Sequence, residues 1–316
     1  MKLAIILDPL ESLKTCKDST YAMMREAHAR GHALYVMEQH ELILSEGKVK
    51  AHARRLELVD EDLKWFSLQE AAWHELTDFD VTLMRKDPPF DMEYIYSTYL
   101  LELAEAQGAR ILNRPEAVRD FNEKLSTAKF PQFMPPTLVT RQEDLIRGFI
   151  DQHGDIILKP LDAMGGSSIF RIRQHDPNLN VIIETMTQLG TRTVMAQRFI
   201  PEIAQGDKRI LLINGEPVPY ALARIPQGGE TRGNLAAGGK GVAQPLSEND
   251  WKIADTLGPK LREQGLFLVG LDVIGDYLTE INVTSPTGFQ EITAQSGFNV
   301  AGMFVDALEK TVRGEA

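Results

Sequence analysis

Three oxygen-bearing side chains near the C-terminal end of the sequence have the types and spacing of a magnesium site. Glu280 and Asn282 are two residues apart in the strand-like segment YLTEINVT, so their side chains face the same side. Asp272 lies in the preceding apolar segment, VGLDVIG, and a lone carboxylate in a buried strand needs a partner. Such oxygens suit Mg²⁺ (or Mn²⁺), although the same residues also fit a solvated sheet face.

The turn between these two segments decides whether Asp272 belongs to the site. A turn of three residues places Asp272 opposite Glu280 on one face, whereas a turn of two residues places it on the other face. The sequence leaves both lengths open.

A second group of residues has the character of a phosphate site. Lys159 ends the apolar segment DIILKP, and the loop LDAMGGSS follows it. Gly165, Gly166 and Ser167 allow close backbone approach and offer N–H donors to phosphate oxygens. The chain contains no G-x-x-x-x-G-K-[ST] motif, and most glycine–serine turns only connect strands, so this loop alone is a weak signal.

Three further cations are candidates for binding anions. Lys124 lies in NEKL, where it also fits an ordinary surface lysine. Arg209, in GDKRI, offers a bidentate clamp for carboxylate or phosphate, or else a charge at a strand edge. Arg85 ends the strand VTLMR, where α/β sheets present ligand groups, and is a candidate for a substrate carboxylate or an ordinary ion pair.

The elements that must position these residues differ between the two halves of the chain. The first half opens as β-α-β, which predicts a parallel sheet with crossover helices over about residues 1–115. The second half has adjacent strands separated by helices, which is typical of an α+β arrangement. We expect strands at 2–9, 33–37, 81–85, 109–113, 155–160, 169–173, 193–200, 208–215, 217–225, 267–275 and 277–284; helices at 18–30, 93–108, 142–152, 178–189, 247–263 and at the end of the chain; and a hairpin over 41–59.

Residues 225–241, IPQGGETRGNLAAGGKG, form a long stretch without helix or strand periodicity. A compact domain seldom carries such a loop unless it is functional or disordered. Its glycines permit mobility and close backbone approach, so we expect it to be mobile without ligand and to close when ligand is bound.

Composition and charge limit the classes of function that the protein can have. Apolar residues make up 43% of the 316 residues and charged residues 25%, which is ordinary for a folded soluble protein. The net charge of −11 argues against a general nucleic-acid binder but permits a small anionic ligand. The opening apolar stretch is too short for a membrane span, and a single cysteine, Cys16, fits the reducing cytoplasm.

These segments together resemble the bacterial glutathione synthetases of the ATP-grasp superfamily. The resemblance runs through essentially the whole chain, and its most specific blocks are LMRKDPPFD, IPQGGETRGNLAAGG and LTEINVTSPTG. It implies an α/β and α+β fold with an N-terminal substrate domain (1–121) and an ATP-grasp region (122–316). The latter divides into a central lid (122–200) and a C-terminal catalytic part (201–316).

The family resemblance also implies an activity and residue roles. The expected reaction joins γ-glutamylcysteine and glycine with cleavage of ATP, through an acylphosphate, in a homotetramer without nucleic-acid or membrane partners. Lys124, Lys159 and the loop with Gly165, Gly166 and Ser167 would hold ATP phosphates, Gln197 would lie on the strand at the adenine, and Asp207 would reach the ribose. Asp272, Glu280 and Asn282 would bind the metal, Arg209 and Arg232 would lie near the reacting centre, and Arg85, Ser285, Thr287 and Gly288 would bind substrate.

Two alternatives stay open at this point. Another ATP-grasp carboxylate–amine ligase would share the ATP-site residues, although the blocks toward the acceptor side favour glutathione formation. A nucleotide-binding module without catalysis is disfavoured, because it has little need of a complete set of magnesium ligands.

Overall fold

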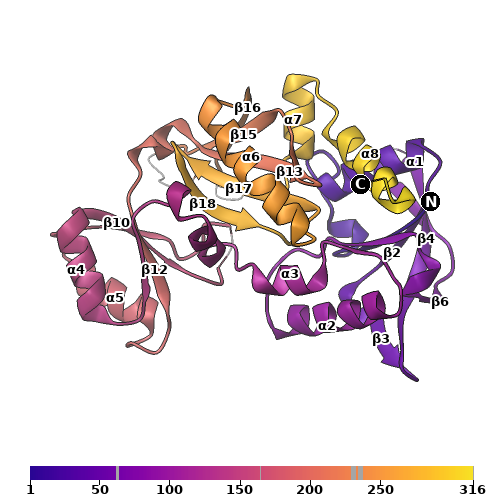
Figure 1. The fold of residues 1–316 in the computed structure, drawn as a ribbon, viewed down its shortest axis with the longest axis horizontal. Helices are drawn as coiled ribbons and strands as arrows, with labels where there is room; N and C mark the ends of the chain where they lie inside the picture. The colour runs from indigo at the N-terminus through magenta and orange to yellow at the C-terminus, as the bar shows by residue number, and fades with distance from the viewer. Residues whose placement is uncertain (62–63, 164, 229–232, 234–237, 316) are drawn as a thin grey trace.

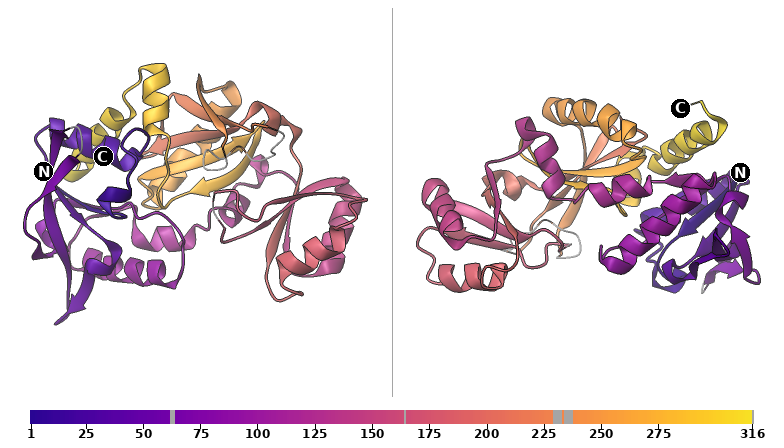
Figure 2. Two further views of the ribbon diagram at one scale, coloured as in Figure 1. Left: turned by 180° about the vertical axis from the view of Figure 1, so that it is seen from behind. Right: turned by 60° about the horizontal axis from the view of Figure 1, so that its bottom comes forward.

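The computed structural model describes residues 1–61, 64–163, 165–228, 233 and 238–315, which form three sheets with helices packed on them (Figure 1). The sheet of the first half lies at one end of the molecule and the sheet formed by residues 137–198 at the other, with the third sheet between them in both views of Figure 2. None of the helices in these described parts is long and apolar enough to cross a membrane.

The first sheet has the order β3-β4-β2-β1-β7-β8, with β5 and β6 pairing to β4. Its central strands are parallel, as the opening β-α-β pattern predicts, and the long hairpin of β3 and β4 confirms the expected hairpin. The elements are β1 Lys2–Ile6, α1 Ser19–Ala29, β2 Ala33–Met37, β3 Leu42–Ser45, β4 Lys48–Glu61, β5 Lys64–Leu68, β6 Ala72–Glu75, β7 Val81–Met84, α2 Met92–Ala106, β8 Ile111–Leu112 and α3 Pro115–Asp120.

The second sheet is antiparallel, with the order β11-β10-β12-β9, and two helices cover it. Its core consists of residues from this segment alone, such as Ile146, Leu158 and Ile183. The elements are β9 Thr137–Thr140, α4 Glu143–His153, β10 Asp155–Pro160, β11 Phe170–Arg173, α5 Leu179–Thr187 and β12 Val194–Arg198.

The third sheet has the order β16-β15-β13-β17-β18, with β14 pairing to β13. Strand β16 and helix α7 were not predicted from the sequence. The elements are β13 Asp207–Ile213, β14 Glu216–Pro217, β15 Tyr220–Ile225, β16 Lys240–Pro245, α6 Glu248–Glu263, β17 Leu268–Ile274, β18 Tyr277–Asn282, α7 Phe289–Ser296 and α8 Val300–Arg313. Short 3₁₀ helices at 10–12, 39–41, 76–78, 125–129, 131–133 and 201–205 complete the described structure.

The first and third sheets share hydrophobic cores, whereas the second sheet does not share theirs. One core joins residues of β1 and α1 to residues of β13, α7 and α8, and helix α8 packs beside α1 near the N-terminus (Figure 1). Because residues from the two ends of the chain share a hydrophobic core, the first and third sheets form one structural unit. The second sheet, which has its own core, is a separate unit attached to it.

The side chain of Asn113 connects the first sheet to the third. Its Nδ2 donates to the carbonyl oxygens of Leu268 (2.8 Å) and Val283 (2.7 Å), and its Oδ1 accepts from the amides of Phe267 (2.7 Å) and Leu268 (2.8 Å). Asn113 is buried, so water does not replace these partners.

We expect Asn113→Ala to lower the free energy of unfolding by about 3 kcal/mol, because it leaves four buried backbone groups unpaired. Asn113→Asp keeps the two acceptor contacts and loses the two donor contacts, so it should not recover full stability. Urea unfolding of the two variants measures this, and a loss below about 1 kcal/mol for Asn113→Ala would contradict the expectation.

Candidate active site

A cavity of about 790 Å³ lies where the three sheets meet. Every sheet contributes to its wall, so the site depends on segments far apart in the sequence. The first sheet and its connections contribute Asp8, Pro9, Ser12, Leu13, Lys14, Lys17, Asp18, Asp87 and Pro88. The second sheet contributes Ile157, Lys159 and residues 197–200. The third contributes Asp207, Arg209, Leu222, Arg224, Asp272, Ile274, Thr279, Glu280, Asn282 and the segment 284–287.

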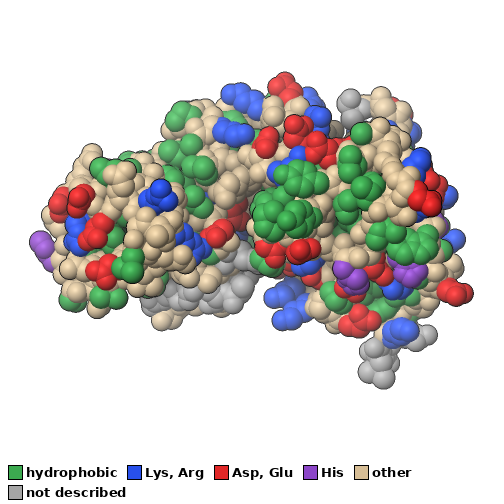
Figure 3. All heavy atoms as spheres, turned by 90° about the horizontal axis from the view of Figure 1, so that it is seen from below, with side chains coloured by type: hydrophobic (Ala, Val, Ile, Leu, Met, Phe, Trp, Pro, Cys, Tyr) green, Lys and Arg blue, Asp and Glu red, His purple; other side chains and the backbone are tan. Residues whose placement is uncertain are grey.

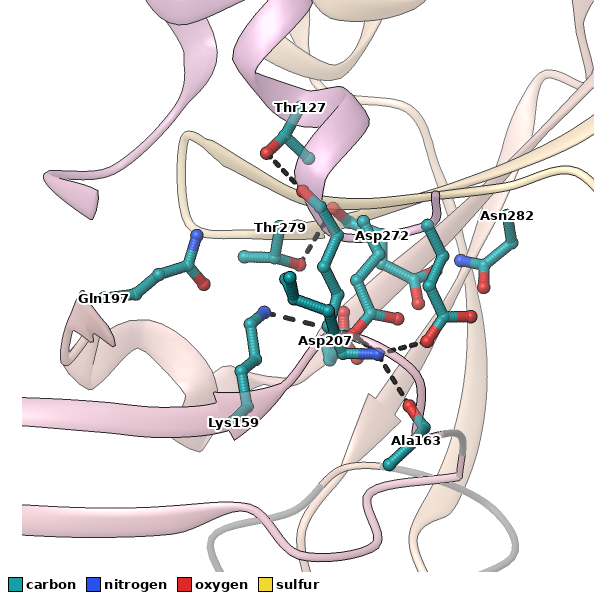
Figure 4. A network of polar contacts seen from close by, with 12 residues as sticks. Thr127, Lys159, Ala163, Gln197, Asp207, Asp272, Thr279 and Asn282 are labelled. Atoms are coloured by element: carbon teal, nitrogen blue, oxygen red, sulfur yellow. Dashed lines mark hydrogen bonds and ion pairs between the residues drawn. The ribbon is translucent and has the colours of Figure 1, made fainter. Parts of the chain in front are cut away.

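Strand register arranges charged side chains in a row across the third sheet. Asp207 pairs with Arg224 of β15, and Arg209, two residues on, pairs with Asp272 of β17. Asp272 in turn pairs with Glu280 of β18. Because residues paired across a ladder share a face, five charged groups converge on the cavity side of this sheet, and Figure 4 labels Asp207 and Asp272 among them.

The pairing of Asp272 with Glu280 is achieved by a β-bulge. The turn contains two residues, Gly275 and Asp276, a length that by itself would place Asp272 on the opposite face. The pairing shifts between Asp272 and Val273, so Thr279 is the extra residue, and its Oγ1 donates to the carbonyl of Asp272 (3.1 Å). The expectation that a two-residue turn places Asp272 on the opposite face is therefore wrong, because the bulge turns Asp272 toward the site.

Two arginines bind the Asp272 carboxylate. Arg209 contacts it bidentately, through Nε to Oδ1 and through Nη2 to Oδ2 at 3.0 Å, and Arg224 Nη2 lies 2.8 Å from Oδ2. Arg224 also pairs with Asp207. Burial alone would raise the pKa of Asp272, but the two guanidinium charges outweigh it and hold that pKa well below the usual range.

Asp207 has a different environment, although it shares Arg224. Its Oδ1 is buried without a hydrogen-bond partner among the described residues, and burial raises the pKa of Asp207 to about 7. An unpaired buried acceptor at a cavity wall is a point where a donor from a ligand would be stabilised. A hydroxyl group is a donor of this kind.

Two buried lysines lie around Glu280. Lys124 Nζ is 3.6 Å and Lys159 Nζ 3.9 Å from Glu280 Oε1, and Lys124 also pairs with Glu123 and donates to the carbonyl of Ala163 (2.7 Å) (Figure 4). Burial lowers the pKa of Lys159. For Lys124, the charges of Glu280 and Glu123 outweigh burial and raise the pKa. Both ammonium groups are therefore close to the proposed metal ligands.

The donor set fits a divalent cation with a polyphosphate. Asn282 Nδ2 donates to the carbonyl of Gly270 (3.3 Å), and its Oδ1 accepts no hydrogen bond from the described residues. Glu280 is not held bidentately by any described cation. These two groups offer oxygens of the kind that Mg²⁺ binds, and Asp272 joins them only if it gives up part of its contact with the arginines.

Most of the predicted site residues lie in the cavity wall: Lys124, Lys159, Gly165, Gly166, Gln197, Asp207, Arg209, Asp272, Glu280, Asn282, Ser285 and Thr287. Ser167, Arg85 and Gly288 do not line it. Arg232, with residues 229–231 and 234–237 of the stretch 225–241, lies outside the described residues, so the expected closing loop stays a prediction.

Arg85 lies behind the wall. It is buried, and it donates through Nε to Thr20 Oγ1 (3.1 Å) and through Nη2 to the carbonyl of Pro286 (3.0 Å). Gly288, at the start of α7, donates to Ser19 Oγ (3.1 Å). Both residues therefore hold the segment 285–288 against the first sheet, and contact with a ligand would be indirect.

The sequence reasoning missed Arg224, Glu123 and the N-terminal part of the wall. Arg224 carried a readable signal, because a lone cation in the apolar strand YALARI needs a buried partner. Glu123 directly precedes Lys124, which is itself a predicted site residue. Lys14, Lys17 and Asp87 line the cavity, but only the fold brings them to it.

Comparisons with known proteins show the family to which the chain belongs. The models "Prokaryotic glutathione synthetase, N-terminal domain" and "Prokaryotic glutathione synthetase, ATP-grasp domain" match residues 1–119 and 123–297. The chain is 62% identical over 317 residues to the glutathione synthetase of Nitrosomonas europaea, covering 99% of this chain and 98% of that protein. It is 55% identical over 309 residues to that of Escherichia coli, covering 98% of each.

Solved structures show the same fold at low sequence identity. A D-cycloserine synthetase superposes with a TM-score of 0.69 at 14% identity, covering 99% of this chain and all of that one. An ATP-grasp ligase complexed with a minimal precursor, Mg and ADP gives a TM-score of 0.64 at 16% identity, covering 99% and 98%.

Proposed function

The chain belongs to the prokaryotic glutathione synthetase family, and we propose that the cavity between its three sheets is where γ-glutamylcysteine and glycine are joined. The protein is an ATP-dependent ligase of glutathione formation with the ATP-grasp fold. The observation that carries the proposed site is the placement of Lys124, Lys159, Glu280 and Asn282 on one cavity wall.

We propose that ATP binds between the second and third sheets. Ile157, Phe199 and Ile274 offer apolar surface for the adenine, near Gln197 on β12, and Asp207 offers its unpaired oxygen to a ribose hydroxyl. Lys124, Lys159 and the turn of Gly165 and Gly166 would hold the phosphates, with Ser167 beside them. Gly165 and Gly166 have φ values of 64° and 81°, which glycine adopts without strain.

The chemistry follows from these contacts. The cysteinyl carboxylate attacks the γ-phosphorus of ATP and ADP leaves; the glycine nitrogen, after losing a proton, attacks the resulting acyl carbon and phosphate leaves. Glu280, Asn282 and Asp272 would hold Mg²⁺ (or Mn²⁺), which neutralises phosphate charge. Arg209 would stabilise the transferring phosphoryl group, and Arg232, outside the described residues, is proposed to act beside it.

Release of ADP with γ-glutamylcysteine alone, glycine alone and both together tests the substrates. We expect sustained turnover only when both are present. Turnover that is indifferent to glycine, or faster with another amino acid, would favour a different ATP-grasp ligase. Loss of turnover on removal of divalent cations, with recovery on adding Mg²⁺, tests the metal.

We further propose a cytoplasmic homotetramer, with the domain division 1–121, 122–200 and 201–316. The exposed face of α2 carries apolar side chains at heptad-like spacing, Met92, Tyr96, Tyr99 and Leu103, which suits a contact with a second copy. Figure 3 shows hydrophobic side chains gathered on the face seen from below, where α2 lies. A solution mass of four chains is expected, and a monomer at micromolar concentration would contradict it.

A further inference from the structure

The wall that the first sheet contributes to the cavity carries charges of both signs that no described residue neutralises. Lys14 and Lys17 are exposed and line the cavity, and neither forms an ion pair within the described part of the chain. Asp87 lines the same wall, and its carboxylate is likewise without an ion-pair partner there. By contrast, the cations on the opposite walls, such as Lys124 and Arg209, are engaged by carboxylates.

The segment that carries the two lysines is held in place by backbone contacts. The amides of Lys17 and Asp18 both donate to the carbonyl of Lys14 at 2.9 Å. Gln290 Nε2 donates to the carbonyls of Thr15 and Asp18, each at 2.7 Å. Asp18 also caps α1, since its Oδ1 accepts from the amide of Tyr21 (2.7 Å). The lysines therefore project from a fixed turn, which lowers the entropic cost of binding a ligand.

Asp87 is held in a similar way. Its amide donates to Asp8 Oδ2 (2.9 Å), and its carbonyl accepts from Lys86 Nζ (2.9 Å). Lys86 Nζ also pairs with Asp8 Oδ1 at 2.7 Å. These contacts use the charges of Asp8 and Lys86 and the backbone of Asp87, and they leave the Asp87 carboxylate available.

Asp8 and Asp18 also line this wall, but Asp8 pairs with Lys86 and Asp18 caps α1. The remaining two cations and one anion are complementary to a zwitterionic amino-acid head. The nucleotide site takes the second and third sheets, so the first-sheet wall remains for the peptide. We propose that Lys14 and Lys17 bind the α-carboxylate, and Asp87 the α-ammonium, of the γ-glutamyl group. This inference rests on the proposed function, and it makes these three residues determinants of substrate specificity.

Paired substrate and protein changes test the assignment. 4-Aminobutanoylcysteine lacks the α-carboxylate of γ-glutamylcysteine, and glutarylcysteine lacks the α-ammonium group. With γ-glutamylcysteine, we expect Lys14→Gln/Lys17→Gln to raise KM by about tenfold to a hundredfold, because charge-assisted hydrogen bonds are lost. kcat and the KM values of glycine and ATP should stay within about twofold of the wild-type values.

The analogues decide which group each residue binds. The lysine variant should raise KM for glutarylcysteine, which keeps the carboxylate, and leave KM for 4-aminobutanoylcysteine unchanged. Asp87→Asn should raise KM for 4-aminobutanoylcysteine, which keeps the ammonium group, and leave KM for glutarylcysteine unchanged. Lys252→Gln and Asp255→Asn, exposed on α6, are matched controls that should change neither value. An unchanged KM for γ-glutamylcysteine, or an equal rise with both analogues, would overturn the inference. Failure of the wild-type protein to use γ-glutamylcysteine would instead overturn the proposed function.

Discussion

Glu280→Ala lowers the rate of ADP release with both substrates by at least about a hundredfold, while the unfolding temperature stays within a few degrees of the wild-type value. The loss of rate is expected because Glu280 faces the cavity between Lys124 and Lys159 and supplies an oxygen to the proposed metal site. Its removal would weaken charge neutralisation at the transferring phosphoryl group.

The small effect on stability follows from the contacts of Glu280 in the folded protein. Its distances to the two lysine nitrogens, 3.6 Å and 3.9 Å, exceed hydrogen-bond length, and its side chain is 20% exposed. Lys124 retains Glu123 when Glu280 is removed. The variant therefore leaves no isolated buried charge at Lys124, and at Lys159 it removes only a long contact of 3.9 Å.

Thermal unfolding and steady-state ADP release of the same preparations separate the two effects. Glu216→Ala, exposed on β14 of the third sheet, is a matched control that should retain both properties. A Glu280→Ala protein that unfolds easily but turns over normally per folded molecule would contradict the proposed role.

The sequence could predict elements whose information is local. Strand β10 has the predicted bounds, and α1 begins one residue after the predicted start, with Asp18 as its cap, because apolar runs and capping residues act over a few positions. The side-chain alternation that places Glu280 and Asn282 on one face is equally local. The structure confirms these features, which the sequence predicts without knowledge of the tertiary contacts.

Features that depend on strand register or on contacts between distant segments could not be predicted. The bulge at Thr279 is a choice of register, and the sequence pattern gave no signal for it. Arg85 was expected to contact substrate because it ends a strand, but the segment before α7 covers that strand end, where Arg85 donates to the carbonyl of Pro286 and its own carbonyl accepts from Ser285. Likewise Lys14 and Asp87 reach one cavity only through the order of strands in the first sheet.

Arg224→Met should lower the free energy of unfolding by about 3–5 kcal/mol, the cost of breaking a buried ion pair by removing one partner. Arg224 is buried, and its Nη2 pairs with both Asp207 and Asp272. Its pKa is raised, because these two charges outweigh the effect of burial. Without it, Asp207 retains no ion-pair partner among the described residues, although Arg209 still binds Asp272.

A second substitution identifies the source of that loss. Asp207→Asn removes the carboxylate that Arg224→Met leaves unpaired, so the double variant should be more stable than Arg224→Met alone. Arg224→Lys keeps the charge but cannot contact both carboxylates through a planar fork, and it should fall between wild type and Arg224→Met. Urea unfolding of wild type, Arg224→Met, Asp207→Asn and the double variant measures the coupling between the two sites. If the two losses simply add, the stabilising effect of Arg224 does not come from neutralising Asp207, and its packing in β15 becomes the explanation.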